Sequence, residues 1–238
     1  MIPKKIHYCW FGRNPKPKLA EKCIASWKKY CPDYEIIEWN EDNFDINMNV
    51  YTRYCYENKK WAYLSDFARL YVVAENGGVY FDTDVELLKN PDELLKLEAF
   101  YGFETEKCIN TGLGFGAEKN HPTVMAMVEE YEKLMKEPSE TFTSVTCPVH
   151  NTEALIKFGF IGNGKRLTVC GAEIFPIEYF NPYDDPTGKL NKTRNTVSIH
   201  WYSKSWMSKS TIIRSKLTKP FHRIFGNNCF DWLKRIIK

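Results

Sequence analysis

The sequence predicts an α/β protein in which helices cover both faces of one sheet, with a helical tail at the C-terminus. Short β-branched and aromatic runs alternate with stretches of helical periodicity, the pattern of a sheet whose strands are joined by helices. The 238 residues fit one domain, and 43% hydrophobic with 26% charged residues is typical of a folded globular chain. Ligands bind such sheets at the carboxyl ends of strands, so residues there are the first candidates for function.

The first part of the chain supplies most of the predicted sheet. Its expected elements, in order, are a strand at 6–11, a helix at 19–30, a strand at 34–39, a helix at 51–76 and a strand at 79–81. Gly12 ends the first strand, and Pro32 stops the first helix because proline lacks the N–H group that a helix needs. Gly77 and Gly78 end the long helix, since glycine readily adopts the left-handed conformation common there.

The rest of the chain continues the alternation of strands and helices and then ends in two predicted amphipathic helices. Strands are expected at 100–103 and 111–116, and amphipathic helices at 123–136, 212–225 and 229–237. The sequence shows no internal repeat or linker that would divide its first 210 residues. We therefore expect one α/β domain over residues 1–210 and a basic amphipathic tail over residues 211–238.

The positive charge of the chain is concentrated near its C-terminus. From residue 204 onward nine Lys and Arg residues stand against one acidic residue, Asp231, a net charge of +8, while the preceding chain carries −5. A body with that charge does not suit nucleic-acid binding over a broad face. A basic amphipathic helix suits an anionic membrane surface. The same segment can also pack on the domain with its charges in water, and the sequence leaves both possibilities open.

Cysteine usage and hydropathy predict a cytoplasmic protein with free thiols. None of the eight cysteines forms a C-x-x-C pair, so zinc-ribbon and thioredoxin-type sites have no support. The N-terminus enters a predicted strand without the apolar core of a signal peptide, and no apolar run is long enough to span a bilayer. We expect the protein to work in the cytoplasm, at most in peripheral contact with the inner face of a membrane.

Two carboxylates follow the predicted strand at 79–81. Asp82 and Asp84 are two residues apart at a strand end, so their side chains project the same way and can face one ligand. Carboxylate oxygens suit a hard divalent cation such as Mg²⁺ or Mn²⁺, which readily bridges phosphate oxygens. In a transferase such a cation neutralises charge on a departing diphosphate. The motif therefore predicts a metal-assisted phosphate or nucleotide-sugar site.

Several ordered motifs resemble those of the DXD sugar-binding glycosyltransferases of family 32, which include yeast initiating mannosyltransferases and bacterial capsular-polysaccharide transferases. The glucosylating domain of large clostridial toxins is a more distant relative. The matching segments are IPKKIHYCWFG (2–12), SDFARL (65–70), GGVYFDTD (77–84), INTG (109–112), EKNHP (118–122) and HWYSKSW (200–206). The resemblance implies a GT-A fold, Mn²⁺ or Mg²⁺, a nucleotide-sugar donor with UDP favoured, and retention of the anomeric configuration.

The resemblance also implies roles for residues that bind the donor. Trp10 would stack on the nucleobase and Asn43 would lie beside it, although a core tryptophan and a helix N-cap are the plainer interpretations. Ser65 would contact the donor, Tyr80 would line its pocket or simply pack in the strand, and Asp82 would reach the ribose as well as the metal. Ser205 and Trp206, with Ser203, would cover the diphosphate from a closing loop.

Catalytic and metal-binding roles come from the same resemblance. Asp66 and Arg69 lie three residues apart on one helical face, where they would bind sugar hydroxyls and diphosphate or form a structural ion pair. Asn110 would approach the transferred sugar or hold a turn. Asp84 would ligate the metal directly. His200 would be the third ligand, where the toxins have an acid, although a lone histidine is more often structural.

The sequence thus predicts a retaining hexosyltransferase of surface polysaccharide biosynthesis that uses a glycan or a lipid-linked acceptor. No carboxylate stands out as a nucleophile, so front-face attack is preferred over a covalent intermediate. One alternative is a haloacid-dehalogenase-type phosphatase, which also uses D-x-D after a strand but places it near the start of the chain. A second is a non-catalytic protein that binds sugar nucleotides. The identity of the sugar and of the acceptor cannot be read from the sequence.

Overall fold

The computed structural model describes residues 1–204, 207, 209–226 and 229–230. Its strands are β1 (Lys5–Cys9), β2 (Glu35–Trp39), β3 (Gly78–Tyr80), β4 (Val85–Leu87), β5 (Ala99–Gly102), β6 (Phe115–Ala117), β7 (Leu167–Val169), β8 (Ala172–Phe175), β9 (Tyr183–Asp184), β10 (Lys189–Leu190) and β11 (Ser198–His200). Its α-helices are α1 (Lys18–Tyr30), α2 (Val50–Glu57), α3 (Trp61–Asn76), α4 (Pro122–Leu134), α5 (Cys147–Ile156), α6 (Ile177–Phe180) and α7 (Lys209–Phe225). Short 3₁₀ turns form at η1 (Asp92–Lys96), η2 (Thr111–Leu113) and η3 (Ser139–Thr141).

A mixed seven-stranded sheet in the order β2-β1-β3-β6-β5-β8-β7 forms the centre of the molecule. β1 pairs in parallel with β2 and β3, whereas β6 runs antiparallel to both β3 and β5. β3 and β5 therefore run in the same direction, and the residues that follow them leave the sheet at the same edge. This edge carries the candidate site.

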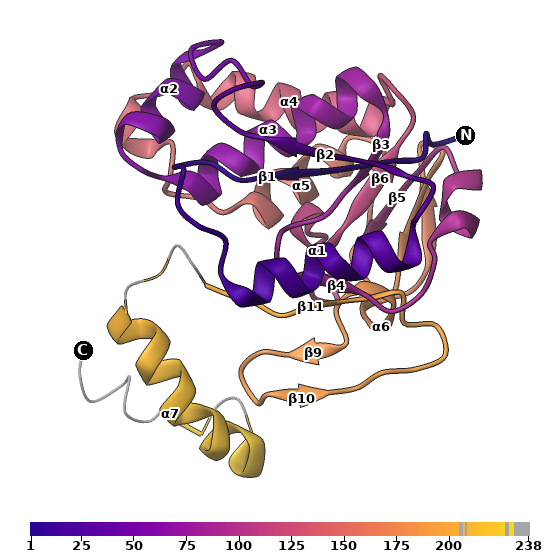
Figure 1. Cartoon of the computed structure of the whole chain (residues 1–238), viewed down its shortest axis with the longest axis vertical. Coiled ribbons are helices and arrows are strands. Elements are labelled where there is room, and N and C mark those ends of the chain that lie inside the picture. The colour runs from indigo at the N-terminus through magenta and orange to yellow at the C-terminus, as the bar shows by residue number, and fades with distance from the viewer. Residues whose placement is uncertain (205–206, 208, 227–228, 231–238) are drawn as a thin grey trace.

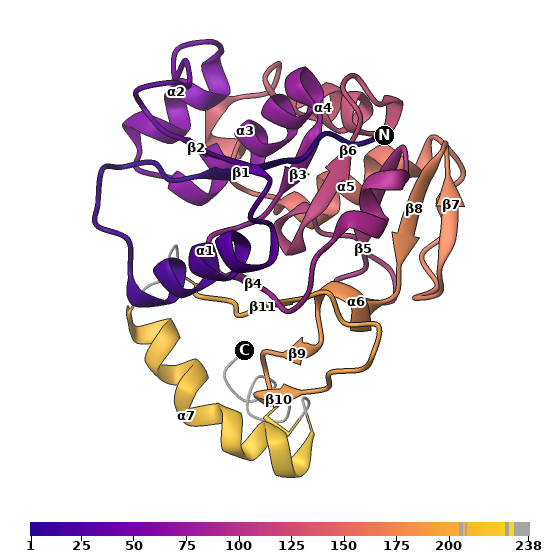
Figure 2. The same ribbon diagram turned by 45° about the vertical axis from the view of Figure 1, so that its right-hand side comes forward.

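Helices cover both faces of the sheet, as predicted. Figures 1 and 2 show α2, α3, α4 and α5 on one face and α1 with α6 on the other. Each face has its own apolar cluster: Phe67 and Met127 belong to the first, and Trp27 and Phe180 to the second. The expected α/β class, with a GT-A-like sheet, is confirmed.

The single helix expected at 51–76 is two helices, so this prediction was wrong. α2 ends at Glu57 and α3 begins at Trp61, with Lys59 in the left-handed region at φ 54°. Residues 57–60, which run from the last residue of α2 to the residue before α3, all have exposed polar side chains, so the apolar stripe that would hold one continuous helix against the core is interrupted there. The break lets each helix bury its own face.

The strand expected at 111–116 is also only partly formed. Thr111–Leu113 makes a 3₁₀ turn, Gly114 has φ 115°, and only then does β6 begin. A Cβ on Gly112 would lie 2.5 Å from Asp82 Oδ2, so glycine lets this turn approach the carboxylate. The turn therefore replaces the start of the strand because it packs against the site.

A separate two-stranded ribbon joins β4 to β11, with His200 paired to Val85. Both views place α7 beside the β9–β10 hairpin and away from the sheet. The helix predicted at 229–237 falls mostly outside the described residues, and Cys229 and Phe230 lie in a turn.

All eight cysteines are free. Among the described residues, none of the helices has the length and apolarity needed to cross a bilayer.

Candidate functional site

Asp82, Asp84 and His200 meet at the edge where β3 ends. Their ligand atoms all lie within 4.8 Å of one another, and His200 Nε2 is 3.1 Å from Asp84 Oδ1. The two aspartates come from the loop between β3 and β4, and the β4–β11 pairing brings the distant His200 beside them. The sequence-predicted metal ligands are thus brought together by one local motif and one long-range strand pair.

Asp84 and His200 stabilise each other's charged form. Burial would raise the pKa of Asp84, but the charge and hydrogen bond of His200 and the Ser203 main-chain N–H, which donates to Oδ2 at 2.7 Å, hold it well below its usual range. Burial would lower the pKa of His200, yet the Asp84 carboxylate more than offsets this and raises it. The Asp84 carboxylate is therefore ionised across the physiological range.

Arg69 lies buried between two of the acidic side chains. Its guanidinium Nη2 is 2.7 Å from Asp66 Oδ1 and 3.1 Å from Asp82 Oδ1. The Tyr80 hydroxyl donates to the same Asp82 oxygen at 3.0 Å, and the Tyr80 ring faces the guanidinium at 5.1 Å. Ser65 takes part through its main-chain oxygen, which accepts from Arg69 Nε at 3.2 Å. These contacts fix the guanidinium in one orientation.

Burial sets the protonation of the carboxylates around Arg69. Burial raises the pKa of Asp66 to about 7 despite the attraction of the neighbouring guanidinium. The pKa of Asp82 is also raised, mainly by burial and against the pull of Arg69. The pKa of Arg69 is raised well above its ordinary value, because its two acidic neighbours outweigh the burial that would lower it. Arg69 is therefore always charged.

The donor set fits a hard divalent cation. Carboxylate oxygens with one imidazole nitrogen are ligands that Mn²⁺ and Mg²⁺ accept. Asp66, Asp82 and Asp84 bring three carboxylates against one guanidinium and one imidazole, so with all three carboxylates ionised the cluster has an excess of negative charge that a cation would neutralise. His200 Nδ1 is buried without a hydrogen-bond partner among the described residues, so the ring is oriented through Nε2.

Asn110 lies at the same edge, beside the Gly112 turn that approaches Asp82. Its Oδ1 accepts from Gly112 N at 2.7 Å, and its Nδ2 donates to Glu104 Oε1 at 3.0 Å. Tyr202 also donates to that Glu104 oxygen, at 3.3 Å, and the Tyr202 ring packs on His200 with 4.1 Å between ring centroids. Sequence reasoning missed Glu104 and Tyr202. A carboxylate just past the predicted strand at 100–103 was the signal that could have found Glu104.

Trp10, which the sequence predicts to stack on the nucleobase, lines an open hollow of about 250 Å³. Its lining residues come from the end of β2 and from the loops after β1 and β2: Trp10, Arg13, Asn14, Lys16, Glu38, Asn40 and Glu41. The indole N–H donates to the Asn14 carbonyl at 2.7 Å, and Lys16 Nζ lies 5.7 Å from the indole ring. Trp10 is half-buried here, so part of its side chain remains accessible to a ligand.

Asn43 stands beside this hollow with its side chain engaged. Its Nδ2 donates to the Glu38 carbonyl at 2.8 Å and its Oδ1 accepts from Asn40 N at 2.9 Å. No helix begins at Asn43, so the N-cap interpretation was wrong, and the side chain instead closes a turn. Asn43 would therefore influence a nucleobase in the hollow only by shaping the loop after β2.

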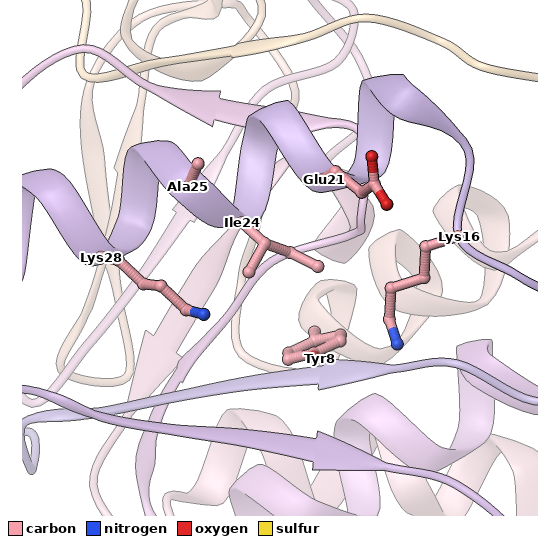
Figure 3. Close-up of a pocket in the computed structure, with 6 residues that line it drawn as sticks. All are labelled: Tyr8, Lys16, Glu21, Ile24, Ala25 and Lys28. Carbon is pink, nitrogen blue, oxygen red and sulfur yellow. The ribbon is translucent and has the colours of Figure 1, made fainter.

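A second hollow, of about 310 Å³, separates β1 from α1. Figure 3 shows Tyr8 and Lys16 facing Ile24 and Lys28 of the helix across it. Lys16 lines both hollows, which therefore adjoin. Neither of these two hollows is lined by Asp82 or Asp84. Ser205 and Trp206, expected to cover a diphosphate, lie outside the described residues.

Comparison with known proteins finds similarity in the region of the chain that contains Asp66, Arg69, Asp82 and Asp84. Residues 17–101 match the family described as glycosyltransferase sugar-binding region containing DXD motif. Inositol phosphoceramide mannosyltransferases 1 and 3 of Schizosaccharomyces pombe are 27% and 26% identical to this chain over 144 and 145 residues. Each alignment covers 56% of this chain but only 44% and 38% of the relative, so the chain spans less than half the length of these relatives.

Two solved structures of glycosyltransferases are similar to this chain. The PaToxG glycosyltransferase superposes with a TM-score of 0.53 at 18% identity, over 66% of this chain and 69% of that one. A glycosyltransferase involved in glycosylation of the major capsid of PBCV-1 gives a TM-score of 0.49 at 11% identity, over 90% and 98% of the two chains. The first of these similarities supports the architecture of the sheet and its helices.

Proposed function

We propose that this chain is a metal-dependent hexosyltransferase, related to the glycosyltransferases whose DXD-containing sugar-binding region its residues 17–101 match. It takes a sugar from a UDP- or GDP-sugar, UDP favoured, and transfers it with retention to a glycan or lipid-linked acceptor of surface polysaccharide biosynthesis. The observation that carries the proposal is the convergence of Asp82, Asp84 and His200 on one point beside the buried Arg69. The family match favours this reaction over the phosphatase alternative.

Asp82, Asp84 and His200 would hold Mn²⁺ or Mg²⁺ in this reaction. When bound, the cation supplies charge neutralisation for the departing diphosphate. The chain's own part is to keep the ligands in place: Ser203 N–H fixes Asp84, and the β4–β11 pairing fixes His200. Arg69 adds a permanent positive charge that costs no reorganisation, because Asp66 and Asp82 already orient it.

The remaining roles follow the geometry of the site. Trp10 would stack on the base in the open hollow, with Asn43 shaping its loop and Tyr80 and Ser65 holding the donor side. Asp66, Arg69 and Asn110 would act on the transferred sugar. Front-face attack remains the preferred route to retention, since Asp66 and Asp82 are both engaged by Arg69 and neither is free to serve as a nucleophile.

Replacing Asp84 by Asn tests the metal role. The amide keeps the size of the side chain but removes the charge, so we expect Mn²⁺-stimulated hydrolysis of UDP- or GDP-sugars to fall at least about a hundredfold. Thermal unfolding with and without Mn²⁺ and UDP checks binding: the ligands should raise the melting temperature of the wild type and not that of Asp84→Asn. Full activity in the variant would refute the proposed ligand.

The tail would bring the enzyme to a membrane that carries its acceptor. α7 is attached on one side: Lys219 Nζ contacts the Tyr183 hydroxyl at 2.8 Å and Asp185 at 3.1 Å. A row of apolar side chains at helical spacing remains exposed on α7: Ile213, Leu217, Phe221, Ile224 and Phe225. Residues 209–225 contain no acid, so an anionic bilayer at the inner face suits this helix.

Vesicles test the membrane contact and the division into a domain of residues 1–210 and a tail of 211–238. The full chain should co-sediment with phosphatidylglycerol vesicles and not with phosphatidylcholine vesicles, because the attraction needs anionic lipid. The variant Leu217→Glu with Phe221→Glu should lose binding while its unfolding and its hydrolysis of donor stay unchanged. Equal sedimentation of wild type and variant would refute the anchor.

A further inference from the structure

Glu104 is an acidic side chain at the site. It belongs neither to the motifs found in the sequence nor to the cluster of Asp82, Asp84 and His200. It follows β5 by two residues. Since β3 and β5 both pair antiparallel with β6, Glu104 and Asp82 leave the sheet at the same edge. A carboxylate at the carboxyl end of a strand is where an α/β sheet presents ligand-binding groups.

The Glu104 carboxylate is held from two directions through one oxygen. Asn110 Nδ2 and the Tyr202 hydroxyl both donate to Oε1, at 3.0 and 3.3 Å. Asn110 continues into the Gly112 turn that lies against Asp82, and the Tyr202 ring packs on His200. Glu104 therefore connects the turn that contains Asn110 with the segment that contains His200 and Tyr202.

The second oxygen, Oε2, has no hydrogen-bond partner among the described residues. A carboxylate offers about four acceptor sites, so about half of the acceptor capacity of the Glu104 side chain is unused. Within the described part of the chain it also forms no ion pair, although the side chain is half-buried. A fixed, half-buried acceptor that forms no direct ion pair suits a neutral donor group such as a hydroxyl.

We propose that Glu104 binds a hydroxyl group of the transferred sugar, with Oε2 as the acceptor. The inference rests on the proposed function and deepens it, because it names a residue that would distinguish a sugar nucleotide from the nucleotide alone. A hydrogen bond from a hydroxyl to an ionised carboxylate is shorter and stronger than one between neutral groups. Glu104 would thus contribute to binding of the hexose and not of the diphosphate or base.

The variant Glu104→Gln separates these contributions. Its amide oxygen can still accept from Asn110 and Tyr202, while an N–H group that donates takes the place of the accepting Oε2. Calorimetry at low temperature in the presence of Mn²⁺ measures the binding of UDP and GDP, and of UDP-glucose, UDP-galactose and GDP-mannose. Affinity for the sugar nucleotide that the wild type prefers should fall about tenfold or more, and affinity for its nucleoside diphosphate by less than about twofold.

Three further variants make the result decisive. Glu106→Gln, an exposed glutamate on the same loop, should bind every ligand like the wild type. Tyr202→Phe removes one hydrogen bond to Glu104 but keeps the carboxylate, so sugar-nucleotide affinity should fall by less than about threefold. A loss in Tyr202→Phe equal to that in Glu104→Gln would show that Glu104 only positions its neighbours, and would overturn the proposal.

Equal affinity of Glu104→Gln and wild type for the sugar nucleotide, or an equal loss for nucleotide and sugar nucleotide, would also overturn it. Failure of the proposed function gives a different result. In that case the wild type itself binds none of these nucleotides with Mn²⁺, and Asp84→Asn behaves like the wild type.

Discussion

The metal-binding end of the site and the hollow around Trp10 hold their charges differently. Around Asp82 the charged groups are buried or half-buried and each has a specific partner, with Arg69 only 5% exposed. Around Trp10 the ion pair of Arg13 with Asp42 leaves both side chains more than 60% exposed. Burial makes a charge expensive unless it is paired, whereas water screens an exposed pair. The buried end should therefore tolerate few changes, and the open end many.

Removal of the Arg69 guanidinium is the strongest test of this comparison. Arg69→Met leaves Asp66 and Asp82 facing each other without a cation, so we expect a loss of about 3 to 5 kcal/mol of unfolding free energy at about pH 8. Urea unfolding measures it. The double variant Asp66→Asn with Arg69→Met should recover part of the loss, because it removes one unpaired charge. A loss below about 1 kcal/mol would place Arg69 with the exposed pairs.

Asp66 should make stability depend on pH at the buried end. Its pKa is about 7 in the folded chain against the ordinary value of 3.8, so between these values the folded state binds more protons than the unfolded state. Its contribution to stability is complete below about pH 4 and is lost as pH rises through 7, by up to about 4 kcal/mol. Urea unfolding across this range should show a smaller fall for Asp66→Asn, and identical pH profiles would contradict the shift.

At the open end, Trp10→Ala should affect binding more than folding. Stacking of a base on an aromatic ring contributes about 1 to 3 kcal/mol, so affinity for UDP with Mn²⁺ should fall about ten- to a hundredfold. Trp10→Phe keeps a stacking face and is the matched control. Calorimetry and urea unfolding together check the prediction. Unchanged UDP affinity in Trp10→Ala would remove the base from this hollow.

The smallest effect is expected for the exposed ion pair beside Trp10. Arg13→Gln breaks the contact between Arg13 Nη2 and Asp42 Oδ1, which measures 2.5 Å, yet the free energy of unfolding should stay close to that of the wild type, because water screens the exposed pair. Urea unfolding at low and high salt measures the change. An effect as large as that of Arg69→Met would erase the difference between the two ends.

Local sequence patterns predicted the parts of the site that lie close together along the chain. Asp66 and Arg69 share a helical face, and Asp82 and Asp84 follow one strand, as their spacings indicated. Long-range parts were predicted only through the family resemblance, as for His200, or not at all, as for Glu104. The break between α2 and α3 was visible as the polar residues 57–60, but the apolar residues on either side favoured one helix.

By itself the sequence determined that strands alternate with helices and that two carboxylates follow a buried strand. Helical and strand periodicity are properties of neighbouring residues, so they can be read directly. Only the tertiary structure decided that His200 lies 3.1 Å from Asp84, that Arg69 is shared by two acids, and that Asn43 closes a turn. Those contacts depend on the β4–β11 register and on packing across the sheet, which bring together residues far apart in the chain.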